Sequence, residues 1–166
     1  QDPFLLPNTD QAVNRIRQAL KKQEQIAIFG DFDADGVTSS AVLTLGLTAL
    51  GANLIPYIPD RASEGHGLNL SAIHWLGQQD VRLIITADCG ITSTSEVTAA
   101  TELGIDTVIT DHHMPAGLPP DALAVVNPKL NGAKSPFSNL ASVGVAFTLM
   151  RALYADLVRP LDETLL

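Results

Sequence analysis

Short apolar runs and longer segments of helical spacing alternate along the chain. In the longer segments apolar residues recur every three or four positions, as in an α-helix, whereas the short runs have the length of buried strands. The predicted strands cover residues 25–30, 53–59, 81–87, 105–110 and 122–128. The predicted helices cover residues 8–23, 37–51, 69–79, 93–104 and 139–157. This alternation predicts an α/β fold, a parallel five-stranded sheet with helices on both faces.

Residues at the segment ends support these boundaries. Asn8 and Asn69 are expected to cap the first and third helices, and Gly51 and Gly104 to close the second and fourth. The Pro-rich stretch 113–122 is typical of a loop and not of a domain linker. We therefore expect one domain over residues 1–166.

The composition is that of a folded domain, much of which is interior. Of 166 residues, 46% are hydrophobic and only 17% are charged, against roughly 25% charged in a typical domain. We therefore expect part of the surface to be covered in the whole protein. The chain starts at Gln1 without a methionine and stops at Leu166, so we expect a piece of something longer.

The net charge of −8 argues against a simple basic nucleic-acid binder. It does not exclude an enzyme that acts on nucleic acid, because bound cations can reverse the local sign of charge. Cys89 is the single cysteine, so no intrachain disulfide is possible, and a reducing, cytoplasmic setting fits best. No apolar run reaches the roughly 18 residues of a membrane span, so we expect no membrane partner.

Three predicted strands end in acidic or imidazole side chains. The first is followed by Asp31, Asp33 and Asp35, the third by Asp88, and the fourth by residues 111–113, which are Asp-His-His. In open α/β sheets, ligands bind at the carboxyl ends of the strands, so these side chains are expected to meet in one crevice. Carboxylates with imidazole and without thiolates suit Mn²⁺ or Mg²⁺. Two such ions would serve a displacement at phosphorus.

Each piece alone has a simpler interpretation. Residues 31–36 could form a turn with helix caps, Asp-Cys-Gly at 88–90 is common in turns, and the Asp-His-His stretch could be a solvated loop. A calcium EF-hand is excluded because its loop needs Glu at the twelfth position, where Val42 stands. Finding all three at successive strand ends favours the metal site.

Other candidates are open to two interpretations. Arg61 pairs well with phosphate in principle, but could be an ordinary surface arginine. His66, in a Gly-flanked loop, could touch substrate or support the loop. Cys89 is expected to be a packing residue, because its thiolate beside Asp88 would be disfavoured. His74, beside Trp75 in a predicted helix, is expected to be structural.

Six segments resemble, in order, the motifs of one family: "GDFDADGVTSSAVL", "DRASEGHGLN", "TADCGITS", "VITDHHMP", "VVNPK" and "LASVGVAFTL". Over nearly its whole length the chain is similar to the N-terminal catalytic region of RecJ-type exonucleases, in the DHH phosphoesterase superfamily. "DHH" marks only the superfamily, whereas "EGHG" and the "NPK" and "SVGVAF" segments point to RecJ.

The resemblance implies a 5′-to-3′ exonuclease that degrades single-stranded DNA to 5′-mononucleotides in repair and recombination, with one or two Mn²⁺ or Mg²⁺ ions. It implies a monomer, with single-strand-binding or other repair proteins as candidate partners. The implied metal ligands are Asp31, Asp33, Asp35, Asp88 and His112. The implied catalytic residues are Asp33, Asp35, Asp88, Asp111, His112 and His113, with Asp111 supporting a ligand. The implied substrate or phosphate contacts are Arg61, His66, His113, Ser142 and Gly144.

Two departures from the family pattern bear on activity. Phe29 stands where some DHH phosphoesterases have a histidine ligand, so a second ion is expected to bind more weakly. The family has a further metal aspartate after the long helix, and C-terminal DHH-associated and OB-fold domains that grip the strand. These would lie beyond Leu166, so we expect impaired activity from the isolated chain.

Three rival functions remain. A phosphatase or nuclease of the same superfamily would act on short oligonucleotides or cyclic dinucleotides. A haloacid-dehalogenase-like phosphatase would use Asp33 as nucleophile and Asp35 as acid and base, but would leave the second and third motifs unexplained. A DHH-like domain could also scaffold replication proteins without catalysis.

Overall fold

The computed structural model describes residues 1–130, 135–159 and 161. Its strands are β1 Gln25–Gly30, β2 Asn53–Tyr57, β3 Val81–Ala87, β4 Asp106–Thr110 and β5 Ala124–Val126. Its helices are the short η1 Pro3–Leu5, then α1 Thr9–Lys22, α2 Ala34–Ala49, α3 Leu70–Gln78, α4 Thr94–Glu102 and α5 Ser142–Asp156. Among these helices, none is long and apolar enough to cross a membrane.

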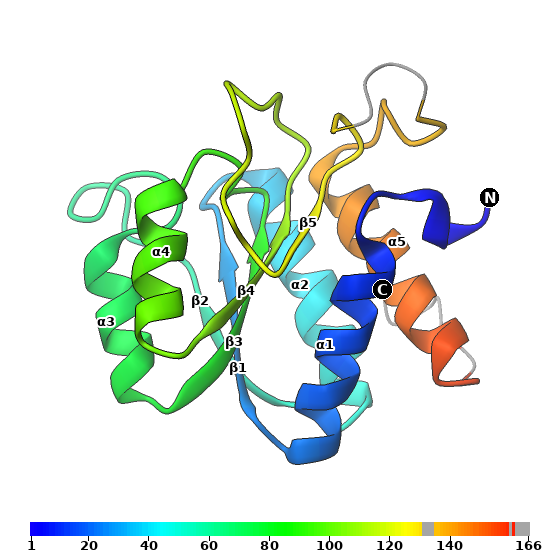
Figure 1. Ribbon diagram of the computed structural model, residues 1–166, viewed down its shortest axis with the longest axis horizontal. Coiled ribbons are helices and arrows are strands. Elements are labelled where there is room, and N and C mark those ends of the chain that lie inside the picture. The colour runs from blue at the N-terminus through cyan, green and yellow to red at the C-terminus, as the bar shows by residue number, and fades with distance from the viewer. Residues whose placement is uncertain (131–134, 160, 162–166) are drawn as a thin grey trace.

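The strands form one parallel sheet in the order β2-β1-β3-β4-β5 (Figure 1). The predicted five-stranded parallel sheet is therefore confirmed. Because all the strands run the same way, their carboxyl ends share one edge, from which the loops at the top of Figure 1 emerge. Any chemistry that follows β1, β3 and β4 is thereby brought to the same side of the molecule.

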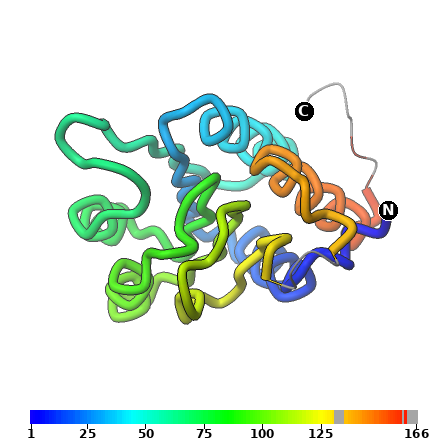
Figure 2. Tube along the Cα trace, turned by 90° about the horizontal axis from the view of Figure 1, so that it is seen from above, coloured from blue at the N-terminus to red at the C-terminus, as the bar shows by residue number. Residues whose placement is uncertain are grey.

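Helices cover both faces of the sheet, as the alternating pattern predicted. Figures 1 and 2 show α1, α2 and α5 on one face and α3 and α4 on the other. Along β1 the side chains alternate between the two layers: Ile26 and Ile28 join the core beneath α1, α2 and α5, and Phe29 joins the core beneath α3 and α4. The sheet is thus buried on both sides and can hold its edge loops rigidly.

Helices α2 and α5 begin three residues away from their predicted starts, α2 earlier and α5 later. Helix α2 begins at Ala34, three residues early, because the Asp33 carboxylate accepts the Gly36 N–H at 2.9 Å and caps the helix. Asn69 caps α3 as predicted, accepting from Ala72 N–H. Asn8 precedes α1 but its side chain caps nothing, because its amide donates to the Val125 carbonyl oxygen instead.

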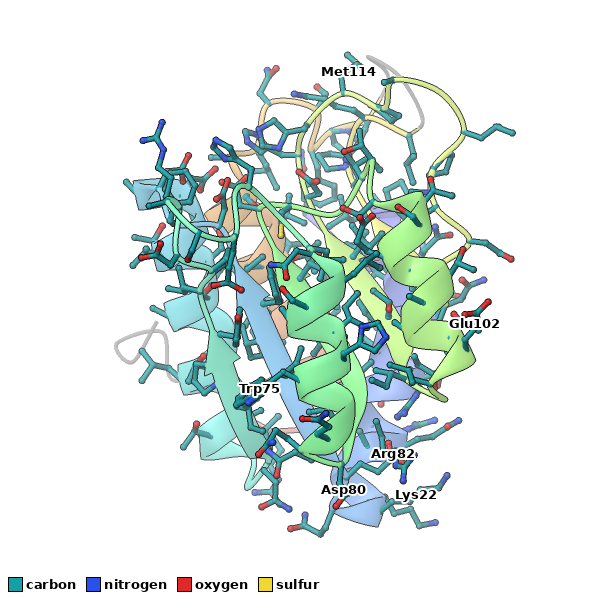
Figure 3. All side chains as sticks on the ribbon, turned by 90° about the vertical axis from the view of Figure 1, so that its left-hand side faces the viewer. Lys22, Trp75, Asp80, Arg82, Glu102 and Met114 are labelled. Atoms are coloured by element: carbon teal, nitrogen blue, oxygen red, sulfur yellow. The ribbon has the colours of Figure 1, made fainter. Side chains whose placement is uncertain are left out.

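At the opposite, amino-terminal edge of the sheet, one arginine contacts residues at the beginnings of β1, β3 and β4. Arg15 of α1 is buried and pairs with Asp106 at 2.5 Å and Glu24 at 2.7 Å. It also donates to the Arg82 carbonyl oxygen at 3.1 Å. Figure 3 shows Arg82 at the far end of the molecule from Met114, which follows the Asp-His-His segment. This network therefore lies away from the candidate chemistry.

Candidate metal centre

The carboxyl edge of the sheet brings together the acids and the imidazole that the sequence placed at three strand ends. The His112 Nε2 atom lies 3.3 Å from Asp88 Oδ1 and 3.5 Å from Asp35 Oδ2. Among the residues that the structure describes, two groups of side chains have ligand atoms within 4.8 Å of one another: Asp88 with His112 and His113, and Asp31 with Asp33 and Asp88. Asp88 belongs to both groups and stands at the centre of the site.

The Asp88 carboxylate is buried beside His112, yet one of its oxygens accepts no hydrogen bond. It is only 2% exposed, and its Oδ1 atom accepts no hydrogen bond. Burial, together with the negative charges of Asp35 and Asp33, raises the pKa of Asp88 to about 7. A buried carboxylate oxygen that accepts no hydrogen bond is costly, and a cation would remove the cost. The donor set of oxygen and imidazole nitrogen fits Mn²⁺ or Mg²⁺.

The first motif is folded tightly between β1 and α2. The Gly36 N–H, donated to the Asp33 carboxylate, lowers the pKa of Asp33. Asp31 accepts the neighbouring Phe32 N–H at 2.7 Å. A Cβ atom on Gly36 would lie 2.7 Å from the Asp31 Cβ atom and still closer to its carbonyl oxygen. Only glycine therefore lets α2 start so close to the end of β1.

Asp35 links this motif to α5. Its two carboxylate oxygens accept the backbone N–H groups of Ser142 at 2.8 Å and Val143 at 2.9 Å. Ala141, the residue before α5, has no side chain that could cap the helix, so Asp35 caps it from more than a hundred residues away. Ser142 is fully buried and Gly144 packs on Leu140, so both belong to the first turn of α5, which Asp35 caps.

Asp111 orders the Asp-His-His segment. Its Oδ1 atom accepts the backbone N–H of His112 at 2.7 Å and of His113 at 3.0 Å, and contacts His113 Nδ1 at 2.8 Å. Its Oδ2 atom accepts Ile91 N–H at 3.0 Å. Burial opposes protonation of His113, but the Asp111 and Asp88 carboxylates outweigh it and raise the pKa of His113. Asp111, only 1% exposed, is thus occupied by its neighbours.

The loop of residues 60–67 brings Arg61 and His66 beside the first motif. The Arg61 guanidinium lies 4.9 Å from the ring centroid of Phe32. The His66 ring centroid is 4.6 Å from the same ring, and its Nδ1 atom is 3.8 Å from Asp31 Oδ2. Both side chains are exposed. They stand next to the acids without touching Asp88.

Two other sequence candidates lie as follows. Cys89 is buried against Phe29, and burial raises the pKa of its thiol well above the usual value, so the predicted packing role is confirmed. His74 is exposed on α3, and its Nδ1 atom contacts the Leu70 carbonyl oxygen at 2.6 Å. It is separate from the site.

A cleft of about 350 Å³ adjoins Asp88 on the side of α4. Its lining includes residues that sequence reasoning did not select: Gly67, Gly90, Ile91, Thr92, Ser93 and Met114. The available signal was the pair of hydroxyl residues at 92 and 93, shortly after the Asp-Cys-Gly motif that follows the third strand. This cleft gives the acids an open side large enough for part of a nucleotide.

Residues 25–166 match the family model described as "DHH family, N-terminal domain". The chain belongs to the DHH family. The family accounts for all three strand-end motifs, which the dehalogenase-like interpretation did not. The DHH domain is 47% identical over 156 residues to the single-stranded-DNA-specific exonuclease RecJ of Bacillus subtilis, covering 94% of this chain and 20% of that protein.

Solved structures show the same DHH fold. The chain matches a crystal structure of exonuclease RecJ bound to manganese with a TM-score of 0.86 at 37% identity, over 93% of this chain and 39% of that one. It matches RecJ of Thermus thermophilus in complex with Mn²⁺ with a TM-score of 0.78 at 35% identity, over 93% and 22%. The chain spans 20% to 27% of the length of five RecJ relatives that it matches.

Proposed function

We propose that this chain is the catalytic DHH domain of a RecJ-type exonuclease. The protein would hydrolyse phosphodiester bonds of single-stranded DNA from the 5′ end and release 5′-mononucleotides. Residues 1–166 would form one domain, and further domains of the whole protein would grip the strand. A net charge of −8 on this domain supports that division, because a polyanion needs basic surface elsewhere to bind.

The observation that carries the proposal is the buried Asp88 carboxylate, whose Oδ1 atom accepts no hydrogen bond and which belongs to both groups of possible ligands. We propose Asp31, Asp33, Asp35, Asp88 and His112 as the residues that hold Mn²⁺ or Mg²⁺. When bound, such ions would activate water and stabilise the charge that develops on the phosphate oxygens.

The other residues would act around this set. His113, with Nδ1 engaged by Asp111, keeps Nε2 for a phosphate oxygen, and Asp111 fixes the orientation of both imidazoles. Arg61 and His66 would contact the phosphate of the incoming strand. Ser142 and Gly144 would act through the start of α5, whose N–H groups hold Asp35 in place.

The test uses the full-length protein with Mn²⁺ and single-stranded DNA labelled at either end. We expect 5′-labelled substrate to release labelled mononucleotide at once, and 3′-labelled substrate to shorten progressively. His112→Ala should abolish both reactions. Activity unchanged in His112→Ala would sink the catalytic assignment. Cleavage confined to dinucleotides or very short oligonucleotides would favour the rival superfamily function, and no cleavage of any of these would favour a scaffold.

A further inference from the structure

Glu64 lies in the loop of residues 60–67, between β2 and α3, and accepts hydrogen bonds from three places. Its Oε1 atom accepts the Tyr57 hydroxyl at 2.5 Å and the Asn69 side-chain amide at 3.4 Å. Its Oε2 atom accepts the Asp60 N–H at 2.9 Å. No strand-end motif contains Glu64, and it belongs to neither group of possible metal ligands.

These three donors mark the places where the loop leaves and rejoins the fold. Tyr57 is the last residue of β2, Asp60 opens the loop, and Asn69 caps α3. The Asp60 carboxylate in turn accepts the N–H groups of Ala62 and Ser63, each at 3.0 Å. Glu64 therefore closes a loop that holds its shape through its own polar groups.

The hydroxyl that Glu64 accepts is itself fixed by aromatic packing. The Tyr57 ring stacks on Phe29 at 5.1 Å between centroids and meets Trp75, labelled on α3 in Figure 3, at 5.6 Å. Burial, and then the Glu64 carboxylate, raise the pKa of Tyr57 to about 12. The hydrogen bond from Tyr57 lowers the pKa of Glu64. At neutral pH the pair is thus a neutral Tyr57 hydroxyl that donates to the Glu64 carboxylate.

The same loop carries Arg61 and His66, which both contact the Phe32 ring. We propose that Glu64 is a positioning residue, which holds this loop so that Arg61 and His66 meet the phosphate of single-stranded DNA at the metal site. The inference rests on the function proposed above. It assigns to a carboxylate a role in binding a polyanion, without contact between the two.

This role predicts that replacing Glu64 changes DNA binding in the direction opposite to the one expected from charge alone. Removing one negative charge from a domain of net charge −8 should strengthen its attraction for DNA. If Glu64 positions the loop, its removal should weaken binding instead. Glu102, on the last turn of α4 and exposed, gives a matched control, because Glu102→Gln makes the same change of charge away from the loop (Figure 3).

The experiment measures steady-state hydrolysis of single-stranded DNA by the full-length protein with Mn²⁺. In Glu64→Gln we expect KM to rise about fivefold to tenfold, the effect of losing one typical intramolecular hydrogen bond, while kcat stays within about twofold. Tyr57→Phe, which keeps the ring and loses the donor, should raise KM in the same direction. The double variant should add little to Glu64→Gln, because both changes remove one interaction.

Glu102→Gln should leave KM unchanged or lower it. Calorimetric Mn²⁺ affinity should be equal in wild type and Glu64→Gln, which separates the loop from the metal ligands. Trypsin should cleave after Arg61 faster in Glu64→Gln than in wild type. If wild type digests DNA and the KM of Glu64→Gln equals that of wild type, the role of Glu64 is overturned and the proposed function stands. If wild type leaves DNA intact, the proposed function itself is overturned.

Discussion

The acids at the carboxyl edge of the sheet share one site but have different environments. Asp33 accepts a helix N–H, which lowers its pKa, and Asp111 accepts three backbone N–H groups. Asp88 has neither, and its backbone φ of 66° is in the left-handed region that few residues other than glycine and asparagine adopt. Asp88 is therefore the side chain that gains most from a bound cation.

Replacing Asp88 by asparagine should separate metal binding from stability. Asn tolerates the left-handed backbone and carries no charge to bury, so the metal-free variant should be more stable than wild type by roughly 1–3 kcal/mol. Its Mn²⁺ affinity should fall by more than about 100-fold. Urea unfolding and calorimetry measure the two effects. Wild-type Mn²⁺ affinity in Asp88→Asn would contradict the proposed ligand set.

The raised pKa of Asp88 also predicts how pH acts. Since Mn²⁺ binds the carboxylate, its affinity should fall about tenfold between about pH 8 and about pH 6, with release of nearly one proton per ion at the lower pH and almost none at the higher. Calorimetry in two buffers of different ionisation enthalpy counts that proton. An affinity independent of pH in this range would show that Asp88 is already ionised.

The raised pKa of Asp88 also makes the free energy of unfolding of the metal-free protein depend on pH. Metal-free folded protein keeps the Asp88 proton up to a pKa of about 7, whereas the unfolded chain loses it near 3.8. The folded state thus binds more protons between these values, and the free energy of unfolding contributed by Asp88 decreases as pH rises through them. The difference between wild type and Asp88→Asn should therefore widen with pH. A constant difference would argue against the shift.

At the scale of elements, the sequence predicted every strand and long helix, because apolar periodicity reports which face is buried. It could not predict where α2 and α5 begin. Helix α2 starts early because Asp33 caps it, and α5 starts late because its cap, Asp35, comes from another helix. The order of the strands and the anchoring of Glu64 likewise depend on contacts between distant segments. The strand-end rule gathered the acids correctly, since it needs only the direction of the strands.

Gly36 offers a test of how closely α2 must approach β1. In Gly36→Ala the new methyl group would overlap Asp31, so either the first motif or the helix start must move. We expect Mn²⁺ affinity to fall at least about tenfold, and unfolding to occur at lower urea concentration. Gly117→Ala is the matched control, because no atom lies within 4 Å of the added group. Equal affinities in the two variants would contradict the tight turn.

For the whole molecule, metal and fold should stabilise each other. An ion that binds only the folded site at a free concentration 100 times its Kd raises the free energy of unfolding by about 2.7 kcal/mol. For a domain of this size Tm should rise by about 5–10 °C. A chelator should reverse the change, and Asp88→Asn should not show it. If addition of Mn²⁺ leaves the Tm of wild type unchanged, these acids hold no ion.

The buried Arg15 network has a consequence for how this domain can change. It ties α1 to the beginnings of three strands at the edge opposite the acids, so this network and the proposed metal ligands lie at opposite ends of the sheet. A laboratory selection for heat resistance could therefore find substitutions at the amino-terminal edge of the sheet that leave the proposed metal site at the carboxyl edge unchanged. Selection for a new substrate could draw on the opposite end in the same way.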